Sequence, residues 1–419
     1  MIDVHLIDSV LGTTLRYHPD NVMVRESLQQ IDSAQRSTIE RINHDIELDL
    51  ILRGATERGY LIDRSALETI VASAEAKAAH CPEFAVRSDS HRRLNPRSNK
   101  QLIRQFEALG VTFASDDHNG EPKLDSDALI ALSQQDQTSP IDQLARAVLD
   151  FRTADNLAKT LRGLRKHLTV HDRVHPVIDV VGAKTGRMTM SAPALQGLTD
   201  ALRHVVLAEP GTVLVTCDLN QIEIRIAAAL SEDQQLIQSI STGDIYLAVA
   251  AELFGRQPTT ADRKIAKQAM LMNLYGAGTN AIAQEAGMSF TDADDLQRRF
   301  RVAYPALDQW CQHVTSLRTI TTVFNRTLNI RGDTGFTAVN HLIQATGRDM
   351  FGDMILSADA AGLDIWLPIH DELIVLARRQ QAVEASHELE TLMTSRFLGV
   401  PIAATAKILG ARWGKKPGM

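Results

Sequence analysis

The chain lacks the features that would place it in a membrane or in an oxidising compartment. No run of about 18 apolar residues, the length that crosses a bilayer, occurs among its 419 residues. Its first five residues contain no basic region ahead of an apolar one, so we expect no secretory signal. Cysteine is scarce: Cys81, Cys217 and Cys311 are odd in number and far apart, which fits a reducing cytoplasm and gives no zinc-type spacing. We therefore predict a cytoplasmic protein without a membrane partner.

An excess of positive charge is absent as well. The chain has 44 Lys and Arg against 51 Asp and Glu, which gives a formal net charge of -7. This balance argues against a surface covered with basic residues, but it is compatible with a basic cleft on an otherwise acidic molecule. The length and the hydrophobic share of 44% predict a sizeable core divided over two or three lobes.

The stretch from Val213 to Ser231 combines a strand with a helix. Its first residues are apolar and β-branched, which predicts a buried strand that ends at Asp218. Ile222, Ile226 and Leu230 follow at intervals of four, which places them on one face of a helix. A lone Asp at this position is most simply interpreted as a helix N-cap.

A second acidic position changes that interpretation. Asp371 and Glu372 lie between two apolar runs in the stretch from Trp366 to Leu376, as at the tip of a hairpin. Burying an unpaired carboxylate is costly, so two acidic positions in apolar surroundings indicate a bound cation. The neighbouring His370 is a poor ligand for Mg²⁺, which prefers oxygen, and is more suited to contact a nucleic acid strand.

A third stretch, Arg263 to Gly276, has the period of a helix. Arg263, Lys267, Leu271 and Tyr275 recur every four residues and therefore lie along one face. Arg263 and Lys267, at the start of that face, carry the positive charge that a nucleoside triphosphate needs for binding. Taken alone, the same pattern is equally typical of an ordinary surface helix with a basic stripe.

Together the three stretches resemble motifs A, B and C of the family A DNA polymerases, the family of bacterial DNA polymerase I. Motif A resembles Asp218-Leu-Asn-Gln-Ile-Glu-Ile-Arg225, motif B resembles Arg263 to Gly276, and motif C resembles His370-Asp371-Glu372. Each match is weak alone, but three in the right order over most of the chain are specific. The resemblance implies an α+β right-hand fold with an antiparallel-sheet palm, helical fingers and a helical thumb.

The resemblance also divides the chain into lobes. We expect an extension of unknown role at 1–37, the thumb with its supporting helices at 38–173, the first part of the palm at 174–235, the fingers at 236–339, and the second part of the palm at 340–419. Within the thumb, the pattern predicts a helix that ends at Arg58, a loop at 116–138 and a long helix at 141–164. In the first of these helices, Ile39, Ile42, Ile46 and Leu50 are expected to lie on one face.

The chemistry of the family assigns roles to the acidic residues. Polymerisation is an in-line displacement at the α-phosphorus of a nucleotide, which two Mg²⁺ ions can assist, with Mn²⁺ as an alternative ion. The resemblance implies that Asp218 and Asp371 hold these ions. Glu372 points away from Asp371 in an extended chain, so it is expected to be an auxiliary ligand or to support the ligands from behind. Lys267 is expected to neutralise or protonate the leaving pyrophosphate.

The resemblance also implies a nucleotide site and a set of DNA contacts. The nucleotide-binding residues are Gln221, Glu223, Arg263, Lys267, Leu271 and Tyr275. The DNA-binding residues are Arg97, Lys100, Arg152 and Lys159 in the thumb and Arg187, Gln196, Asn340, Gln344 and His370 in the palm. The basic segment 87–104 can alternatively be a solvated charged face, although Ser98 is expected to cap a short helix against the duplex backbone.

Two positions in the nucleotide site affect substrate choice. Glu223 and Tyr275 together are expected to close off the sugar 2' position, which favours deoxynucleotides. Leu271 stands where the family has Phe or Tyr, so we expect discrimination against dideoxynucleotides, because leucine has neither a flat face nor a polar tip. The alternative is that Leu271 simply packs in the core of the fingers.

The main prediction is therefore a monomeric, template-directed DNA polymerase that extends a primer with deoxynucleoside triphosphates, in phage or plasmid replication or in repair and gap filling. We expect no proofreading, because too few residues precede the thumb for an exonuclease domain. The alternatives are a single-subunit RNA polymerase, a catalytically inactive DNA-binding replication protein and a metal-dependent nuclease. Glu223 argues against the first, and the intact Asp218, Asp371 and Lys267 argue against the second. A nuclease would leave the triphosphate-type helix unexplained.

Overall fold

The structure, a computed structural model, describes residues 33–79, 94–113, 124–134, 139–241, 243–330 and 336–414. The predicted extension up to residue 32 and Cys81 lie outside these ranges. The chain divides into two compact units: the first is made of 1–59, 175–197 and 208–413, and the second of 60–174, 198–207 and 414–419. No helix in the described ranges is both long and apolar enough to span a bilayer.

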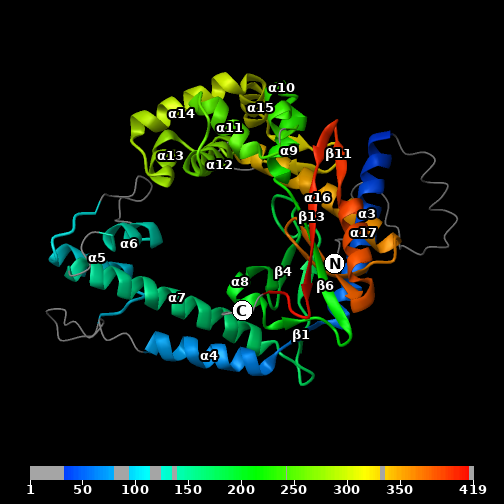
Figure 1. The fold of residues 1–419 in the computed structure, drawn as a ribbon, viewed down its shortest axis with the longest axis horizontal. Helices are drawn as coiled ribbons and strands as arrows, with labels where there is room; N and C mark the ends of the chain where they lie inside the picture. The colour runs from blue at the N-terminus through cyan, green and yellow to red at the C-terminus, as the bar shows by residue number, and fades with distance from the viewer. Residues whose placement is uncertain are drawn as a thin grey trace. The chain divides into compact units, whose positions relative to one another are not determined.

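The first unit is organised around a four-stranded antiparallel sheet in the order β13-β6-β10-β9 (Figure 1). Its strands are β6 (Thr212–Leu219), β9 (Asp364–Ile369), β10 (Glu372–Arg378) and β13 (Ala404–Gly410). The predicted apolar runs form these strands, because residues 213–217 of β6 and 373–377 of β10 are all buried. Helix α9 (Ile222–Ser231) begins directly after β6, as the four-residue period predicts.

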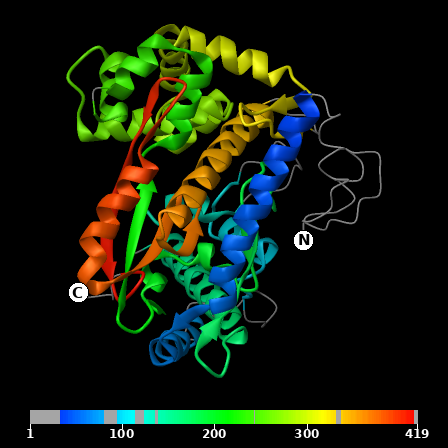
Figure 2. The same cartoon turned by 90° about the vertical axis from the view of Figure 1, so that its right-hand side faces the viewer.

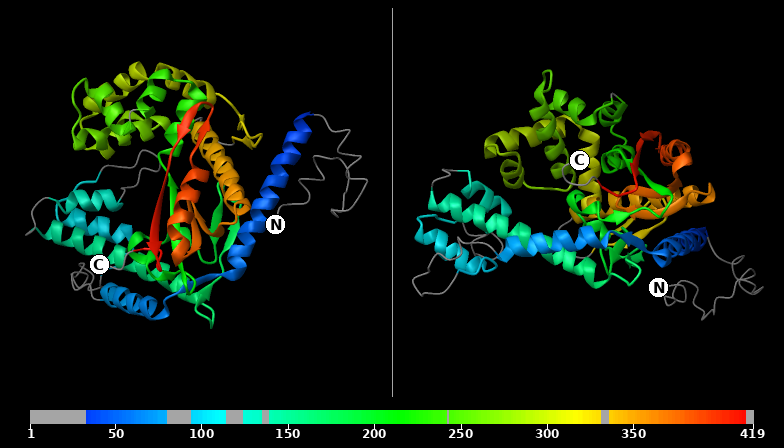
Figure 3. Two further views of the ribbon diagram at one scale, coloured as in Figure 1. Left: turned by 45° about the vertical axis from the view of Figure 1, so that its right-hand side comes forward. Right: turned by 60° about the horizontal axis from the view of Figure 1, so that its bottom comes forward.

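Long helices cover this sheet. Figure 2 shows α3 (Ser33–Arg58) beside α16 (Phe336–Ala360), and Figure 3 shows α17 (Ala382–Met393) beside β13; the contacts between these elements agree. The unit also holds the hairpin β3 (Val177–Asp179) and β4 (Thr189–Ser191), the short helices η2 (Leu195–Gly197) and η3 (Arg379–Gln381), and the hairpin β11 (Ser395–Phe397) and β12 (Val400–Ile402).

A group of helices follows α9 within the same unit. It contains α10 (Gln234–Ser241), α11 (Ile245–Phe254), α12 (Thr260–Leu274), α13 (Thr279–Ala286), α14 (Phe290–Ala303), α15 (Pro305–Thr315) and the hairpin β7 (Thr319–Thr321) and β8 (Thr327–Asn329). The buried Asp233 ties two of these helices together, because its carboxylate accepts hydrogen bonds from Leu236 N at 3.0 Å and from Ala306 N and Leu307 N at 3.1 Å. Thr259 and Asp262 form a capping box that starts α12.

The second unit is mainly helical. It contains α4 (Arg64–Ala79), α5 (Asn99–Ala108), α6 (Ser126–Leu132), α7 (Pro140–Lys166), α8 (Asp200–Arg203) and a small antiparallel sheet of β2 (Arg173–Val174), β1 (Tyr60–Ile62) and β5 (Val206–Leu207). Helix α7 confirms the long helix predicted at 141–164. Ser98 caps α5 as predicted, accepting a hydrogen bond from Gln101 N. The loop prediction for 116–138 is wrong at α6, whose short apolar face packs into the core of this unit.

Helix α3 is present as the period predicts, but Leu50 on the predicted apolar face is 63% exposed. The buried residues of this helix include Arg41, Asp45, Leu48 and Leu52. Arg41 and Asp45 are ion-paired to each other. Helix α3 also belongs to the first compact unit, although we expected it to support the thumb; the assignment of the lobes themselves stays a prediction.

Candidate active site

The fold brings the two predicted catalytic aspartates to the same end of the sheet. Asp218 is the penultimate residue of β6, and Asp371 lies in the turn between β9 and β10. In the β6–β10 pair Asp218 lies opposite Glu372, and Leu219 N donates a hydrogen bond to Asp371 O at 3.2 Å. The turn is tight because His370 adopts a left-handed backbone conformation with φ +55°. Two acidic positions far apart in sequence therefore become neighbours through strand pairing alone.

Glu372 has a different environment from Asp371. Its carboxylate accepts a hydrogen bond from the buried Thr216 Oγ1 at 2.5 Å, along the β6–β10 face. Asp371 instead lines a cavity next to His370. Among the described residues no group of three or more His, Cys, Asp or Glu side chains is arranged to hold a metal ion. Asp371 and Glu372 therefore have different surroundings, although Glu372 lies opposite Asp218 in the strand pair.

The charges in this acidic group repel one another. Partial desolvation, followed by the charges of Asp371 and Glu372, raises the pKa of Asp218 to about 6. Lys407 on β13 opposes this shift, and sequence reasoning missed it because only strand pairing places it opposite Thr216. Burial is also the main cause that raises the pKa of Asp371. A nearby cation would stabilise the charged forms of these carboxylates, because it would offset their mutual repulsion.

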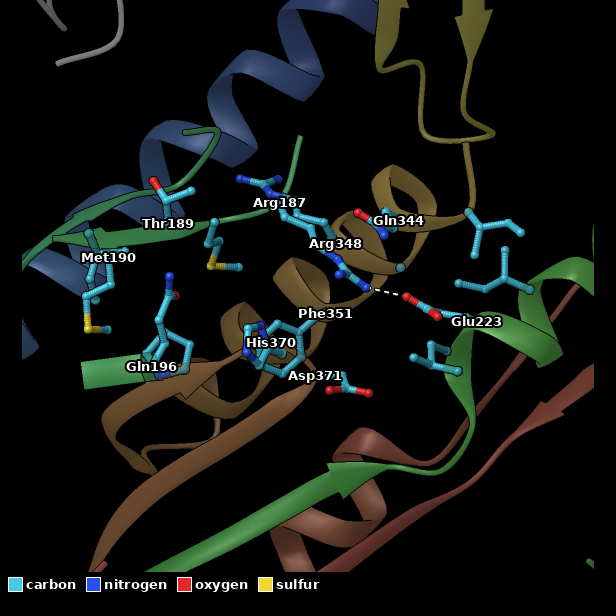
Figure 4. A pocket seen from close by; sticks show the side chains of 17 residues that line it. Arg187, Thr189, Met190, Gln196, Glu223, Gln344, Arg348, Phe351, His370 and Asp371 are labelled. Carbon is cyan, nitrogen blue, oxygen red and sulfur yellow. Dashed lines mark hydrogen bonds and ion pairs between the residues drawn. The ribbon is translucent and has the colours of Figure 1, made fainter. Parts of the chain in front are cut away.

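Glu223, in the first turn of α9, joins two parts of the site. Arg187, just before β4, donates to Glu223 Oε1 at 2.5 Å, and the Tyr275 hydroxyl donates to Glu223 Oε2. Figure 4 draws the contact with Glu223 as a dashed line. Burial, then the charge of Glu223, raises the pKa of Tyr275 far above its ordinary value. The sequence assigned Arg187 to DNA and Glu223 to the nucleotide, but the structure connects them directly.

The two cations of α12 share one aromatic surface. The guanidinium of Arg263 lies 5.2 Å from the centre of the Tyr246 ring, and Lys267 Nζ lies 5.6 Å from it. Arg263 Nε also donates to Asp244 at 2.7 Å, and Asp244 caps the helix α11 that carries Tyr246. Tyr246 was missed as a site residue, since its role depends on the packing of α11 against α12. The Lys267 side chain is exposed.

Leu271 and Gln221, two further candidates for the nucleotide site, are less exposed than Lys267. Leu271 is partly buried and packs against the hydrophobic core of the unit, as does Tyr275. Gln221 has a left-handed backbone with φ +51° at the start of α9, and its Oε1 accepts a hydrogen bond from the buried Arg225 at 3.4 Å. These contacts give Leu271 and Gln221 a structural role. Their predicted contact with a nucleotide stays a prediction.

Asp371 lines a cavity (Figure 4). It is lined by Arg187, Gln196, Gln344, His370 and Asp371, which were all predicted site residues, and by Glu223, Arg348 and several apolar side chains. Gln196 lies on η2 and Gln344 on α16, one turn after Asn340. The buried Oδ1 of Asn340 has no hydrogen-bond partner in the described part of the chain. The structure therefore brings four of the five predicted palm contacts, all but Asn340, around one cavity.

The four predicted thumb contacts lie in the second unit and differ in availability. Arg97 is ion-paired with Asp155 at 2.5 Å, and Arg152 donates to Leu124 O at 2.9 Å and to Asn99 at 2.6 Å. Lys100 and Lys159 are exposed. Residues 87–93 of the basic segment lie outside the described residues. The two lysines are therefore better placed than the two arginines to contact a ligand without losing an internal partner.

The sequence was compared with known proteins. It matches the profile of "DNA polymerase family A" over residues 64–415. The DNA polymerase of Mycobacterium phage D29 is 27% identical over 333 residues, covering 76% of this chain and 54% of that protein. DNA polymerase I of Aquifex aeolicus is 29% identical over 347 residues, covering 77% of this chain and 59% of that protein. The chain spans about half the length of these curated relatives.

A solved structure shows the same fold. The POL domain of Pol1 from M. smegmatis, in complex with DNA primer-template and dNTP, superposes with a TM-score of 0.79 over 99% of this chain and 79% of that one, at 22% identity. This match confirms the predicted α+β right-hand polymerase fold. The family profile covers most of the chain, including all three motifs and both aspartates at the end of the sheet. The chain therefore belongs to DNA polymerase family A.

Proposed function

We propose that this chain is a DNA-directed DNA polymerase, which adds deoxynucleotides to a primer 3' end by two-metal-ion nucleotidyl transfer. The observation that carries the proposal is the convergence of Asp218 and Asp371 beside a cavity lined by polar side chains. Family membership supports it, as does the likeness to the M. smegmatis POL domain, which was solved in complex with primer-template and dNTP. Primer-template DNA and deoxynucleoside triphosphates are thus the proposed partners.

The acidic pair fits Mg²⁺. This ion is usually bound through one or two carboxylates together with water and substrate phosphates, so two protein ligands are sufficient. The pKa of Asp218, raised to about 6 by desolvation and by the charges of Asp371 and Glu372, supports a site that favours a cation. When bound, Mg²⁺ would activate the primer hydroxyl and stabilise the leaving pyrophosphate. Asp218 and Asp371 would hold it, and Mn²⁺ is expected to substitute.

The side chains around the pair have complementary roles. Lys267 and Arg263 present positive charge from α12, where the phosphates of a nucleotide would lie, and Lys267 would neutralise the leaving pyrophosphate. Glu223, fixed by Arg187 and Tyr275, would occupy the space that a ribose 2'-hydroxyl needs. This fixed carboxylate favours a DNA polymerase over a single-subunit RNA polymerase, because a ribose 2'-hydroxyl in that space would collide with it.

The cavity that Asp371 lines suits the end of a primer. Gln196, Gln344 and His370 can donate hydrogen bonds to minor-groove acceptors. One turn from Gln344 lies the Oδ1 of Asn340, which has no hydrogen-bond partner among the described residues. In the second unit, the exposed Lys100 and Lys159 can contact phosphates without reading sequence. We propose that the biological role of the enzyme is DNA replication or gap filling.

A primer-extension assay tests the proposal. A labelled primer on a longer template should be extended, in the presence of Mg²⁺, only with the complementary deoxynucleotide. Equal use of ribonucleotides would favour the RNA polymerase alternative. Binding of the duplex without extension would favour an inactive DNA-binding protein, and template degradation would favour a nuclease.

A further inference from the structure

A buried cluster of charged side chains joins α3, α16 and the β7–β8 hairpin. Asp45 accepts hydrogen bonds from Arg41 at 3.1 Å, from Arg326 at 2.9 Å and from Arg348 at 2.5 Å. Asp349 accepts from Arg326 Nε at 2.8 Å. The Arg348 side chain is only 1% exposed, and that of Asp45 is 9% exposed. A single carboxylate on α3 therefore orients three guanidinium groups in the interior of the unit.

Two of these arginines also contact the loop between β3 and β4, residues 180–188. Arg348 donates twice to Val180 O, from Nε at 3.0 Å and from Nη2 at 2.8 Å. Arg326 lies against the other end of the loop, because its Cδ is 3.1 Å from the position of a Cβ built on Gly186. Gly186 has φ +77° and directly precedes Arg187, the residue whose guanidinium binds Glu223.

The orientation of both arginines depends on Asp45. A guanidinium that is buried without a carboxylate partner is costly, so losing one partner of a buried ion pair makes the other side chain move or drives water into the site. Asp349 would still hold Arg326, and contacts Arg348 only at 3.3 Å. Asp45 is therefore the principal carboxylate partner of Arg348, and Arg348 is the side chain that holds Val180 O.

We propose that Asp45 is a positioning residue: through Arg348 and Arg326 it holds the loop 180–188 so that Arg187 reaches Glu223. Asp45 lies on α3, ahead of the region 64–415 that matches the family profile, so the profile does not assign it. The effect on the loop depends only on the contacts described above. The effect on nucleotide selection rests on the proposed function, because it acts through Glu223.

Amide hydrogen exchange followed by mass spectrometry tests the effect on the loop directly. In Asp45→Asn, exchange in residues 180–188 should become about tenfold faster while exchange in β6 and β10 stays unchanged, because local opening does not require the sheet to unfold. Asp49→Asn is the matched control, since Asp49 lies one turn further on the same helix and pairs with Arg53 at 2.7 Å. Unchanged exchange in 180–188, or equal acceleration in the sheet, would overturn the proposal.

A double variant separates positioning from stability. Replacing a buried ion pair by apolar residues of similar volume is often neutral for stability. Asp349 still faces Arg41 at 3.5 Å and Arg326 at 2.8 Å, so Asp45→Leu combined with Arg348→Met should melt close to the wild type. The loop should nevertheless exchange rapidly, because both bonds to Val180 O are gone. A loop as protected as in the wild type would refute the proposal, even where Asp45→Asn alone fails to fold.

Primer extension tests how the Asp45 variants change the preference for deoxynucleotides over ribonucleotides. If the wild type extends primers, both variants should lose about tenfold in their preference for deoxynucleotides over ribonucleotides, and Asp49→Asn should lose none; tenfold corresponds to about 1.4 kcal/mol. An unchanged preference would refute the link to Glu223. A wild type that does not extend primers would refute the proposed function instead, and the exchange experiment would still decide whether Asp45 holds the loop.

Discussion

The Tyr275 hydroxyl offers the sharpest test of how this site selects a sugar. It donates a hydrogen bond to Glu223, whose other carboxylate oxygen is held by Arg187. Burial and the charge of Glu223 raise the pKa of Tyr275, so the hydroxyl keeps its proton and remains a donor at every pH of a polymerase assay. Tyr275→Phe removes this donor and leaves the ring and its packing in place.

The expected magnitude follows from the contacts of Glu223. A hydrogen bond to a charged group contributes about 1.5–3 kcal/mol. A difference of about 1.4 kcal/mol is a factor of ten, so the full loss would relax selection by roughly ten- to a hundredfold. Arg187 still holds the other oxygen, so we expect the lower end, about tenfold, in the ratio of kcat/KM for a deoxynucleotide to that for the matching ribonucleotide.

Single-nucleotide insertion kinetics with both substrates would measure this ratio. Tyr304→Phe is the matched control, because Tyr304 is a fully buried tyrosine of the same unit that packs against Phe300. The control should leave the ratio unchanged. An active Tyr275→Phe enzyme with the ratio of the wild type would mean that Glu223 does not need Tyr275 to exclude a ribose.

Three further predictions concern the metal site, the fingers and proofreading. The pKa of Asp218 is raised to about 6 in the folded protein without metal, so the folded protein binds a proton at this carboxylate more tightly than the unfolded chain does. The contribution of protonated Asp218 to the free energy of unfolding is therefore lost as the pH rises through 6. Thermal melts in a chelator should show Asp218→Asn more stable than the wild type at pH 8 but not at pH 4, and equal differences would contradict the shift. Leu271→Tyr should raise chain termination at a fixed ratio of dideoxy- to deoxynucleotides, whereas an unchanged frequency would mean that Leu271 only packs in the core. A primer with a mismatched 3' end, incubated with Mg²⁺ and no nucleotides, should stay full length with this chain, and steady shortening would reveal a nuclease.

The parts of the fold that the sequence predicts are those with a simple local period. The apolar run before Asp218 is typical of a buried strand, as are the two runs around Asp371, and these strands pair in the sheet. The four-residue spacing from Arg263 likewise predicts α12. In each case the local pattern of side chains indicates the type of element.

The parts that the sequence does not predict depend on contacts between distant segments. Arg187 and Glu223 were assigned to different ligands, and only the approach of the β3–β4 loop to α9 pairs them. The position of Tyr246 beneath two cations requires α11 to pack on α12. The burial of Asp45 on α3 is another such case, because three arginines from different segments meet this charged residue there.

The most direct test of the account is primer extension by Asp371→Asn, measured beside its affinity for the primer-template duplex. The change keeps the size of the side chain and removes the charge that would hold Mg²⁺. We predict that single-turnover extension falls by roughly a thousandfold or more, because each ion stabilises the transition state by several kcal/mol. Duplex affinity should be nearly unchanged, because it comes mainly from phosphate contacts. Extension close to that of the wild type would contradict the assignment of Asp371 as a catalytic carboxylate.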